Sequence, residues 1–287
     1  MHLLKHLTRS SYIRRVATTV ARNHVSTSSS GFVEINNSEQ LFYEQRGDKS
    51  QHTLLCIPGA LGNTQSDFSY QLDLLSDTFN VVAFDPRGYG QSKNVLRVFD
   101  AHYFHRDAAD AAEVMRQLGH SSYSVLGWSD GGIAGMILAA QKPECVSNLI
   151  IWGACAYVSE EDKQLMELTR DLSNWSERMR SPLERVYGKE GLAQLWVDFL
   201  DGYCAFYDRP GGICIDELDD IVCPTFVIHG AKDALVPSSH PDYIHSRIKN
   251  SQQFVFPNGK HNLHMKYHKE FNALVRDFIN GRIQSKL

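Results

Sequence analysis

The sequence predicts an α/β fold in which helices cover both faces of a mostly parallel central sheet. Apolar runs typical of strands alternate with segments of helical periodicity along most of the 287 residues, the pattern of parallel sheets with crossover helices. The composition, 43% hydrophobic and 22% charged, is that of a folded globular protein. This length fits one large domain, or one domain that carries an insertion.

The predicted elements follow in a regular order. Residues 32–35 and 41–44 form an opening antiparallel hairpin, and 53–57 is a buried strand that ends in Pro58-Gly59. The later strands are 81–84, the run from 123 to 126, 149–152, 225–229 and 253–256. Segments with apolar residues at helical spacing predict helices at 66–75, 103–118, 133–140, 241–248 and 267–279.

The alternation stops between residues 158 and 208, where the pattern indicates several helices with polar faces. This stretch comes just after a strand end, where the loops of an α/β sheet carry function. We therefore expect it to form a helical lid over the site, inserted into a domain that spans 31–287.

The first thirty residues differ from the rest. They contain Lys5, Arg9, Arg14, Arg15 and Arg22, and the first acidic residue is Glu34. A start rich in Arg and Ser and poor in acids predicts a mitochondrial transit peptide at 1–30 and a mitochondrial location. A disordered basic tail is the alternative.

The net charge of residues 31–287 indicates which classes of partner the protein favours. This part of the chain keeps 24 of the 29 basic residues and all 33 acidic ones, so its formal charge is −9. An acidic surface disfavours nucleic acid and tolerates cationic substrates. No apolar run is long enough to span a bilayer. The cysteines lack Cys-x-x-Cys spacing, which favours buried free thiols over a disulfide framework or a zinc site; they are Cys56, Cys145, Cys155, Cys204, Cys214 and Cys223.

A serine lies at the centre of a Gly-x-Ser-x-Gly motif, at Ser129 between Gly127 and Gly131. A strand-type run precedes it and a helix-type run follows, which is the context of a nucleophile elbow. There the serine occupies a strained turn, and its hydroxyl projects at the start of a helix, where backbone N–H groups favour negative charge. We therefore expect Ser129 to be a nucleophile.

A serine nucleophile needs a base and a group that orients the base. Asp233 follows an apolar strand and a glycine turn, whereas the rival carboxylates Asp216, Glu217, Asp219 and Asp220 precede that strand. His261 lies in a turn-rich loop after the last short strand, with His264 and His268 as rivals. The order Ser, acid, His favours Asp233 as the orienting acid and His261 as the base.

Two backbone N–H groups should stabilise the oxyanion of a tetrahedral intermediate. One comes from Asp130, the residue after the nucleophile. The other comes from the loop after the strand 53–57, from either Ala60 or Leu61, which the sequence does not separate.

Together these motifs resemble those of the α/β-hydrolase superfamily and, within it, the biphenyl hydrolase-like (valacyclovir hydrolase) family. The resemblance covers nearly everything after the first thirty residues. Its most specific parts are Gly-Trp-Ser-Asp-Gly-Gly (127–132) and Gly-Lys-His-Asn-Leu-His (259–264). It implies a catalytic trio of Ser129, Asp233 and His261, and hydrolysis of α-amino acid esters, including amino-ester prodrugs. It also implies a mitochondrial location.

The side chain of Asp130 is a candidate substrate selector. A carboxylate about 4 Å from an oxyanion is repelled by roughly 4 kcal/mol at an effective dielectric of about 20. A substrate ammonium between the two would turn this repulsion into attraction, so Asp130 predicts preference for a free α-amino group. Alternatively, Asp130 only complements the helix N-terminus, which is worth about 0.3–1 kcal/mol.

Other functions remain as alternatives. The same trio could serve a C–C bond hydrolase, a general esterase or a lactonase, none of which needs a carboxylate at position 130. A non-catalytic ligand-binding protein of this fold is the remote alternative. No metal or organic cofactor is expected. The expected partner is a small amino acid ester, and the expected oligomeric state is a monomer.

Overall fold

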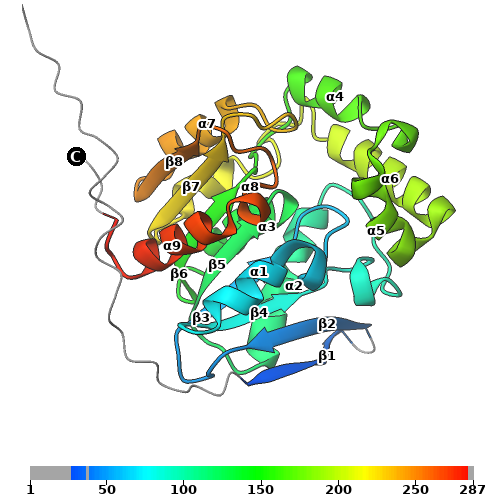
Figure 1. Cartoon of the computed structure of the whole chain (residues 1–287). Helices are drawn as coiled ribbons and strands as arrows, with labels where there is room; N and C mark the ends of the chain where they lie inside the picture. Colours follow the sequence, from blue (N-terminus) through cyan, green and yellow to red (C-terminus); the bar gives the residue numbers. More distant parts are fainter. Residues whose placement is uncertain (1–26, 37–38, 284–287) are drawn as a thin grey trace, which may run out of the picture.

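The computed structural model describes residues 27–36 and 39–283 and confirms the α/β prediction. Within them one sheet runs in the order β1-β2-β4-β3-β5-β6-β7-β8 (Figure 1). β2 pairs antiparallel with β1 and with β4, and every later pair is parallel. The predicted hairpin and the mostly parallel sheet are both present.

The bounds of the elements fall close to the predicted ones. The strands are β1 (Ser28–Asn36), β2 (Glu39–Arg46), β3 (Thr53–Ile57), β4 (Asn80–Phe84), β5 (Tyr123–Trp128), β6 (Val146–Trp152), β7 (Thr225–Gly230) and β8 (Ser251–Phe256). The main helices are α1 (Thr64–Leu75), α2 (Tyr103–Gln117), α3 (Asp130–Gln141), α7 (Ser239–Arg247) and α9 (His268–Ile279). A single helical turn that was not predicted, α8 (Leu263–Lys266), precedes α9, because four residues are too few to show a period.

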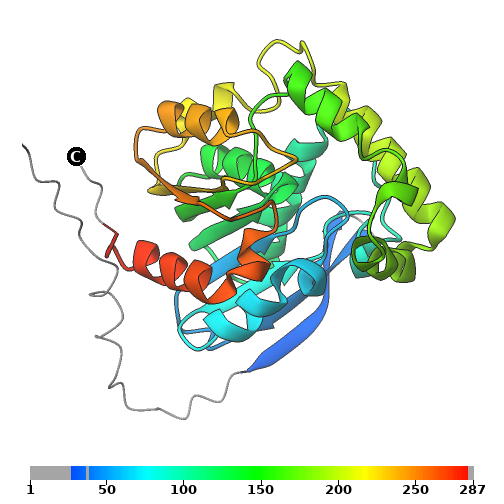
Figure 2. The same cartoon turned by 45° about the horizontal axis from the view of Figure 1, so that its top comes forward.

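The sheet separates two hydrophobic cores. β3 and β4 are buried along their whole length, so alternate residues of each strand face opposite cores. Leu55 packs into the core that contains α2 and α3, and its neighbour Leu54 packs into the core that contains α1 and α9. Figures 1 and 2 show these helices on the two sides of the strands.

The segment between β6 and β7 (residues 153–224), here called the helical insertion, contains the helices expected from 158 to 208. They are α4 (Glu160–Glu167), α5 (Glu177–Tyr187) and α6 (Lys189–Cys204). Figures 1 and 2 show them as a separate group beside the sheet. Their function as a lid stays a prediction.

The predicted transit peptide lies outside the described residues except for its last four. Of these, Ser28, Ser29 and Ser30 belong to β1 and pair with Arg46, Gln45 and Glu44. Ordered β-structure therefore begins slightly before residue 31. None of the described helices has the length and apolar character that crossing a membrane requires. All six cysteines are free thiols.

Candidate active site

The topology brings the predicted site residues to one edge of the sheet. β3, β5, β6, β7 and β8 are parallel neighbours, so their carboxyl ends meet at the same edge. Ser129 follows β5, Asp233 follows β7 and His261 follows β8. The loop that carries Ala60 and Leu61 follows β3.

Ser129 occupies the sharp turn expected of a nucleophile elbow. Its φ is 55° and its ψ is −121°, a conformation that costs a residue with a side chain about 1–3 kcal/mol. The flanking glycines allow the close packing. A Cβ at Gly131 would lie 1.9 Å from the carbonyl oxygen of Ile57, and one at Gly127 would lie 2.4 Å from that of Gly131. Each glycine of the motif thus permits a backbone contact that a side chain would block.

Backbone hydrogen bonds fix the elbow between β6 and α3. The N–H of Ser129 donates to the carbonyl of Trp152 over 2.9 Å, and the carbonyl of Ser129 accepts from Gly132 over 2.8 Å. The Ser129 hydroxyl has no hydrogen-bond partner among the described residues. It is half-buried and available to a substrate.

His261 and Asp233 form a direct pair. Their Nδ1 and Oδ2 atoms are 2.8 Å apart, and the Asp233 side chain is 1% exposed. The other carboxylate oxygen accepts from the N–H groups of Leu235 and Val236 over 2.9 and 3.1 Å. Burial alone would raise the pKa of Asp233, but His261 and these two N–H groups hold that pKa below its ordinary value. An ionised Asp233 accepts a hydrogen bond from the Nδ1–H of His261, which leaves Nε2 able to act as a base.

The His261 ring lies beside the elbow. A Cβ at Gly153 would lie 2.9 Å from Cε1 of His261, and Gly153 directly follows Trp152, which accepts the Ser129 N–H. On the other side, the indole N–H of Trp128 donates to the His261 carbonyl over 3.0 Å. No hydrogen bond joins Ser129 to His261 in the described part of the chain, a common condition in ligand-free sites, where catalytic hydrogen bonds shorten on binding.

The loop of residues 58–62, here called the oxyanion loop, has two unused donors. Pro58 has no N–H; the N–H of Gly59 donates to Asp67, and that of Gly62 donates to the Gly59 carbonyl over 3.0 Å. Within the described residues, the N–H groups of Ala60 and Leu61 have no acceptor. Both predicted candidates therefore remain, and the N–H of Asp130, at the start of α3, is the third donor nearby.

Asp67, on α1, holds the oxyanion loop in place through hydrogen bonds of its carboxylate. This residue was not among those predicted from the sequence. Its Oδ2 accepts from the N–H of Gly59 over 3.0 Å and its Oδ1 accepts from the Ser66 hydroxyl over 2.6 Å. A Cβ at Gly62 would lie 1.9 Å from Oδ2, so only glycine fits there. Burial raises the pKa of Asp67 to about 7.

Asp130 is a buried carboxylate that has no hydrogen-bond partner among the residues that the structure describes. The whole Asp130 residue is 6% exposed, and its Oδ2 atom is buried without a hydrogen-bond donor among the described residues. Burial is the main cause that raises its pKa to about 7; Asp107 adds to this rise, and Arg97 opposes it. Such groups are rare in folded proteins, because an unsatisfied buried charge is costly.

Arg97, whose charge acts on Asp130, is itself paired with another carboxylate. Both terminal nitrogens of Arg97 donate to the carboxylate of Asp107, over 3.0 and 2.8 Å. The guanidinium also lies 4.2 Å from the centre of the Tyr89 ring. Among the described residues, the hydroxyls of Tyr89 and Tyr103 are also buried without partners. The Asp130 carboxylate thus lies among buried polar groups that do not satisfy it.

His264, the rival of His261 for the base, is fully buried and hydrogen-bonded through both ring nitrogens. Its Nδ1 accepts from the indole N–H of Trp152 over 2.9 Å, and its Nε2 donates to the carbonyl of Asp67 over 3.0 Å. Burial lowers its pKa to about 3, so it is neutral. It joins the segment that carries His261 to α1, the helix that follows the oxyanion loop.

We expect His264→Leu to lower the free energy of unfolding by about 2–4 kcal/mol, because it leaves the buried Trp152 indole N–H without an acceptor and removes the hydrogen bond to the Asp67 carbonyl. Urea unfolding at pH 7 measures the change. His268→Leu is the matched control: this half-buried histidine stacks on Tyr70 with ring centres 4.2 Å apart, and its loss should cost less than about 1 kcal/mol. Equal losses in the two variants would contradict the assignment.

A second buried histidine joins the helical insertion to the main domain. Nε2 of His240, on α7, lies 2.8 Å from Oδ2 of Asp162, on α4, and both side chains are 1% exposed. Asp162 also caps α4 by accepting from the N–H and the hydroxyl of Ser159.

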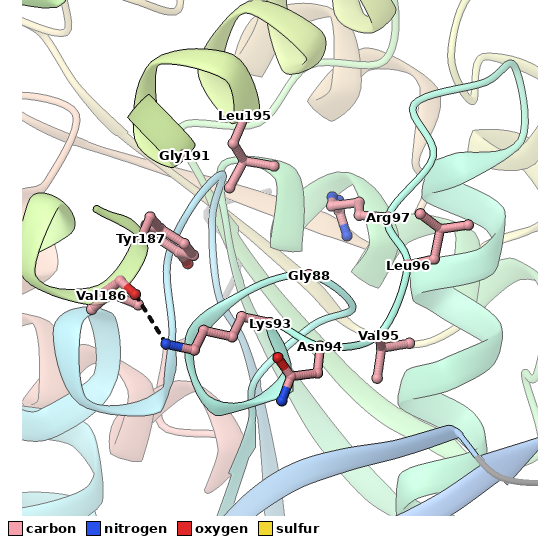
Figure 3. Close-up of a pocket in the computed structure, with 10 residues that line it drawn as sticks. All are labelled: Gly88, Lys93, Asn94, Val95, Leu96, Arg97, Val186, Tyr187, Gly191 and Leu195. Atoms are coloured by element: carbon pink, nitrogen blue, oxygen red, sulfur yellow. Dashed lines mark hydrogen bonds between the residues drawn. The ribbon is translucent and has the colours of Figure 1, made fainter. Parts of the chain in front are cut away.

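A pocket of about 550 Å³ lies between the helical insertion and the segment 88–97 (Figure 3). Val186 and Tyr187 of α5 and Leu195 of α6 line one side. Arg97, the partner of Asp107, lines the other. Lys93 reaches across and donates to the Val186 carbonyl over 3.3 Å. In the described residues, no group of three or more His, Cys, Asp or Glu side chains could hold a metal ion.

Comparison with known proteins identifies the family. Residues 52–189 match the model of the alpha/beta hydrolase fold. The chain is 46% identical to serine hydrolase BPHL of Homo sapiens over 245 residues, which cover 85% of this chain and 84% of the human protein. The chain belongs to the BPHL family of serine hydrolases. The mouse BPHL is 44% identical over the same share of each chain.

Solved structures support the same fold. A serine hydrolase from Cycloclasticus zankles aligns with a TM-score of 0.70 and 20% identity, over 90% of this chain and all of that one. The α/β-hydrolase fold and the resemblance to the biphenyl hydrolase-like family are thereby confirmed. As a BPHL family member, the chain is a serine hydrolase.

Proposed function

We propose that this BPHL family member hydrolyses esters of α-amino acids, with Ser129 as nucleophile, His261 as base and Asp233 as the orienting acid. The observation that carries the proposal is the buried, unpartnered carboxylate of Asp130, the residue directly after the serine. A substrate ammonium is the group that would satisfy this carboxylate. A neutral acyl group would leave it unsatisfied.

The first half-reaction transfers the acyl group to the enzyme. The Ser129 hydroxyl attacks the ester carbonyl while Nε2 of His261 takes its proton, and Asp233 stabilises the imidazolium that forms. The oxyanion accepts hydrogen bonds from the N–H of Asp130 and from that of Ala60 or Leu61. His261 then gives its proton to the departing alkoxide, which leaves as the alcohol.

The second half-reaction uses water in place of the alcohol. His261 removes a proton from the water, whose oxygen attacks the acyl carbon of the Ser129 ester. Collapse of the second tetrahedral intermediate breaks the bond to Ser129, and His261 returns the proton to the Ser129 oxygen. The free amino acid leaves, and the enzyme is restored without any net change.

Asp130 contributes through charge. An empty, ionised Asp130 would oppose the developing oxyanion by roughly 4 kcal/mol at a separation of about 4 Å and an effective dielectric of about 20. A bound ammonium between the two anions reverses that effect. The α-amino group therefore helps binding and also removes an obstacle to the transition state.

The direct test compares pairs of esters that share the alcohol and differ only in the α-amino group, such as a phenylalanine ester and its 3-phenylpropanoate counterpart. We expect kcat/KM to be higher for the amino ester by at least about 100-fold, which corresponds to about 2.7 kcal/mol. Equal values for both members of several pairs would instead favour a general esterase. Cleavage of neither would point to C–C bond or lactone substrates.

The raised pKa of Asp130 predicts a pH-dependent preference. Only the ionised carboxylate attracts an ammonium, and its pKa in the free enzyme is about 7. The ratio of kcat/KM for an amino ester to that for its neutral partner should therefore rise as the pH increases from about 5 to about 6.5, a range in which the amine stays mostly protonated. Taking the ratio cancels any effect of pH on the steps that both esters share. A ratio that stays constant over this range would contradict the role of Asp130.

We also propose that residues 1–30 direct the protein to mitochondria. The support is the acid-poor, Arg- and Ser-rich composition of this segment. Fusing it to a fluorescent protein should yield mitochondrial fluorescence, and deleting it from the full chain should abolish that location. Diffuse fluorescence of the fusion would reject the proposal.

A further inference from the structure

The hydroxyl of Tyr187 connects the helical insertion directly to the oxyanion loop. It donates to the carbonyl of Leu61 over 2.9 Å and accepts from the N–H of Gly90 over 3.0 Å. Tyr187 is the last residue of α5 and is half-buried at the wall of the pocket in Figure 3. One side chain of the insertion thus contacts two loops, which follow β3 and β4.

The two loops that Tyr187 contacts are also joined to each other through the carboxylate of Asp85. Asp85 accepts from the N–H of Thr64, at the start of α1, over 2.8 Å, and from the N–H of Gln91 over 2.7 Å. These bonds place Gly90 at a fixed position relative to the oxyanion loop. The Tyr187 hydroxyl therefore contacts Gly90, which these bonds hold in place, and the strained residue Leu61 of the oxyanion loop.

The hydrogen bond from Tyr187 to the Leu61 carbonyl affects the direction in which the Leu61 N–H points. Leu61 has a φ of +61°, in the left-handed region that residues with a side chain seldom adopt. The peptide group that follows it is held at both ends, its N–H by the carbonyl of Gly59 and its carbonyl by Tyr187. With that peptide fixed, the φ of Leu61 sets the orientation of the preceding peptide and so of the Leu61 N–H.

We propose that Tyr187 is a positioning residue that holds the Leu61 N–H toward the oxyanion, so that docking of α5 on the main domain completes the oxyanion hole. Without the hydroxyl, the peptide after Leu61 loses one of its two anchors, and the strained Leu61 can relax and turn its N–H away. The inference rests on the proposed function, because it assigns Leu61 rather than Ala60 as the second donor.

Tyr187→Phe tests this inference while keeping the aromatic ring. We expect kcat to fall about tenfold on an amino ester and on its neutral partner alike, with KM changed less than twofold, because the loss appears in the transition state. The inhibition constant of an alkylboronic acid, which forms a tetrahedral anion on the serine, should weaken by a similar factor. The melting temperature should stay within a few degrees of that of the wild-type protein.

Tyr207→Phe is the matched control. This tyrosine also lies in the helical insertion, where the Lys163 ammonium lies 4.0 Å from its ring centre, and it is not part of the proposed site. Its kcat should match that of the wild-type protein. If Tyr187→Phe keeps kcat and boronate affinity within twofold, or changes only KM, the inference is wrong. Loss of kcat on neutral esters supports it even if the preference for an α-amino group fails, so the two proposals are judged separately.

Discussion

Ser129→Ala should lower kcat by at least about 10⁴-fold on every ester that the protein cleaves. In a serine hydrolase, removing the nucleophile removes the covalent route, and only the weak effect of the oxyanion hole and substrate binding persists. The Ser129 hydroxyl has no hydrogen-bond partner among the described residues, so its loss should change the free energy of unfolding by less than about 1 kcal/mol. Steady-state kinetics and urea unfolding measure both quantities.

Ser147→Ala is a suitable control for this variant. Ser147 lies on β6, and its hydroxyl is 3.1 Å from that of Ser124, away from the candidate site. The control should keep wild-type activity and react with a fluorophosphonate probe, whereas Ser129→Ala should stay unlabelled. Turnover by Ser129→Ala above about 1% of the wild-type rate would contradict the assignment of the nucleophile.

Asp130→Asn should remove the preference for amino esters with little damage to neutral ones. Losing the charge that binds the ammonium should lower kcat/KM for an amino ester by about 10²–10³-fold, which is about 3–4 kcal/mol. A neutral ester should be cleaved at least as fast as by the wild-type protein, because one like charge near the oxyanion is gone. Equal losses on both esters would show that Asp130 acts only through the fold.

The same variant should be more stable than the wild-type protein at alkaline pH. The pKa of Asp130 is about 7 in the folded protein against an ordinary 3.8. The folded protein therefore holds the proton more tightly, and ionisation costs stability progressively as the pH rises from 3.8 to about 7. At pH 8, Asp130→Asn should gain about 2–4 kcal/mol in the free energy of unfolding, and at pH 4 almost none. An unchanged difference between pH 4 and 8 would contradict the raised pKa.

The chemistry that depends on local pattern could be predicted from the sequence. Ser129 is marked by its two glycines and by the strand and helix around it, and the structure shows the backbone contacts that require those glycines. Asp233 and His261 could be chosen because each follows a strand, and parallel strands bring such positions to one edge. Their hydrogen bond joins residues 28 positions apart in the chain.

The supporting contacts could not be predicted in this way, because they depend on packing between distant segments. Tyr187 and Leu61 are 126 positions apart, and His264 and Asp67 are 197 apart. Nothing in the local pattern of a tyrosine at a helix end or a histidine in a single helical turn indicates such partners. Asp130 is intermediate: its position suggested a role, but only the structure shows that its carboxylate is buried and unsatisfied.

Two of the polar contacts between the helical insertion and the main domain differ in strength. Near α4, both side chains of the His240–Asp162 contact are 1% exposed, so breaking it leaves buried polar groups unpaired at about 1–3 kcal/mol each. At the end of α5, Tyr187 contributes neutral hydrogen bonds worth about 0.5–1.5 kcal/mol each. Of these two contacts, the one at the end of α5 should therefore break more often in thermal motion. Bulky alcohol portions of a substrate would then pass between α5 and the segment 88–97.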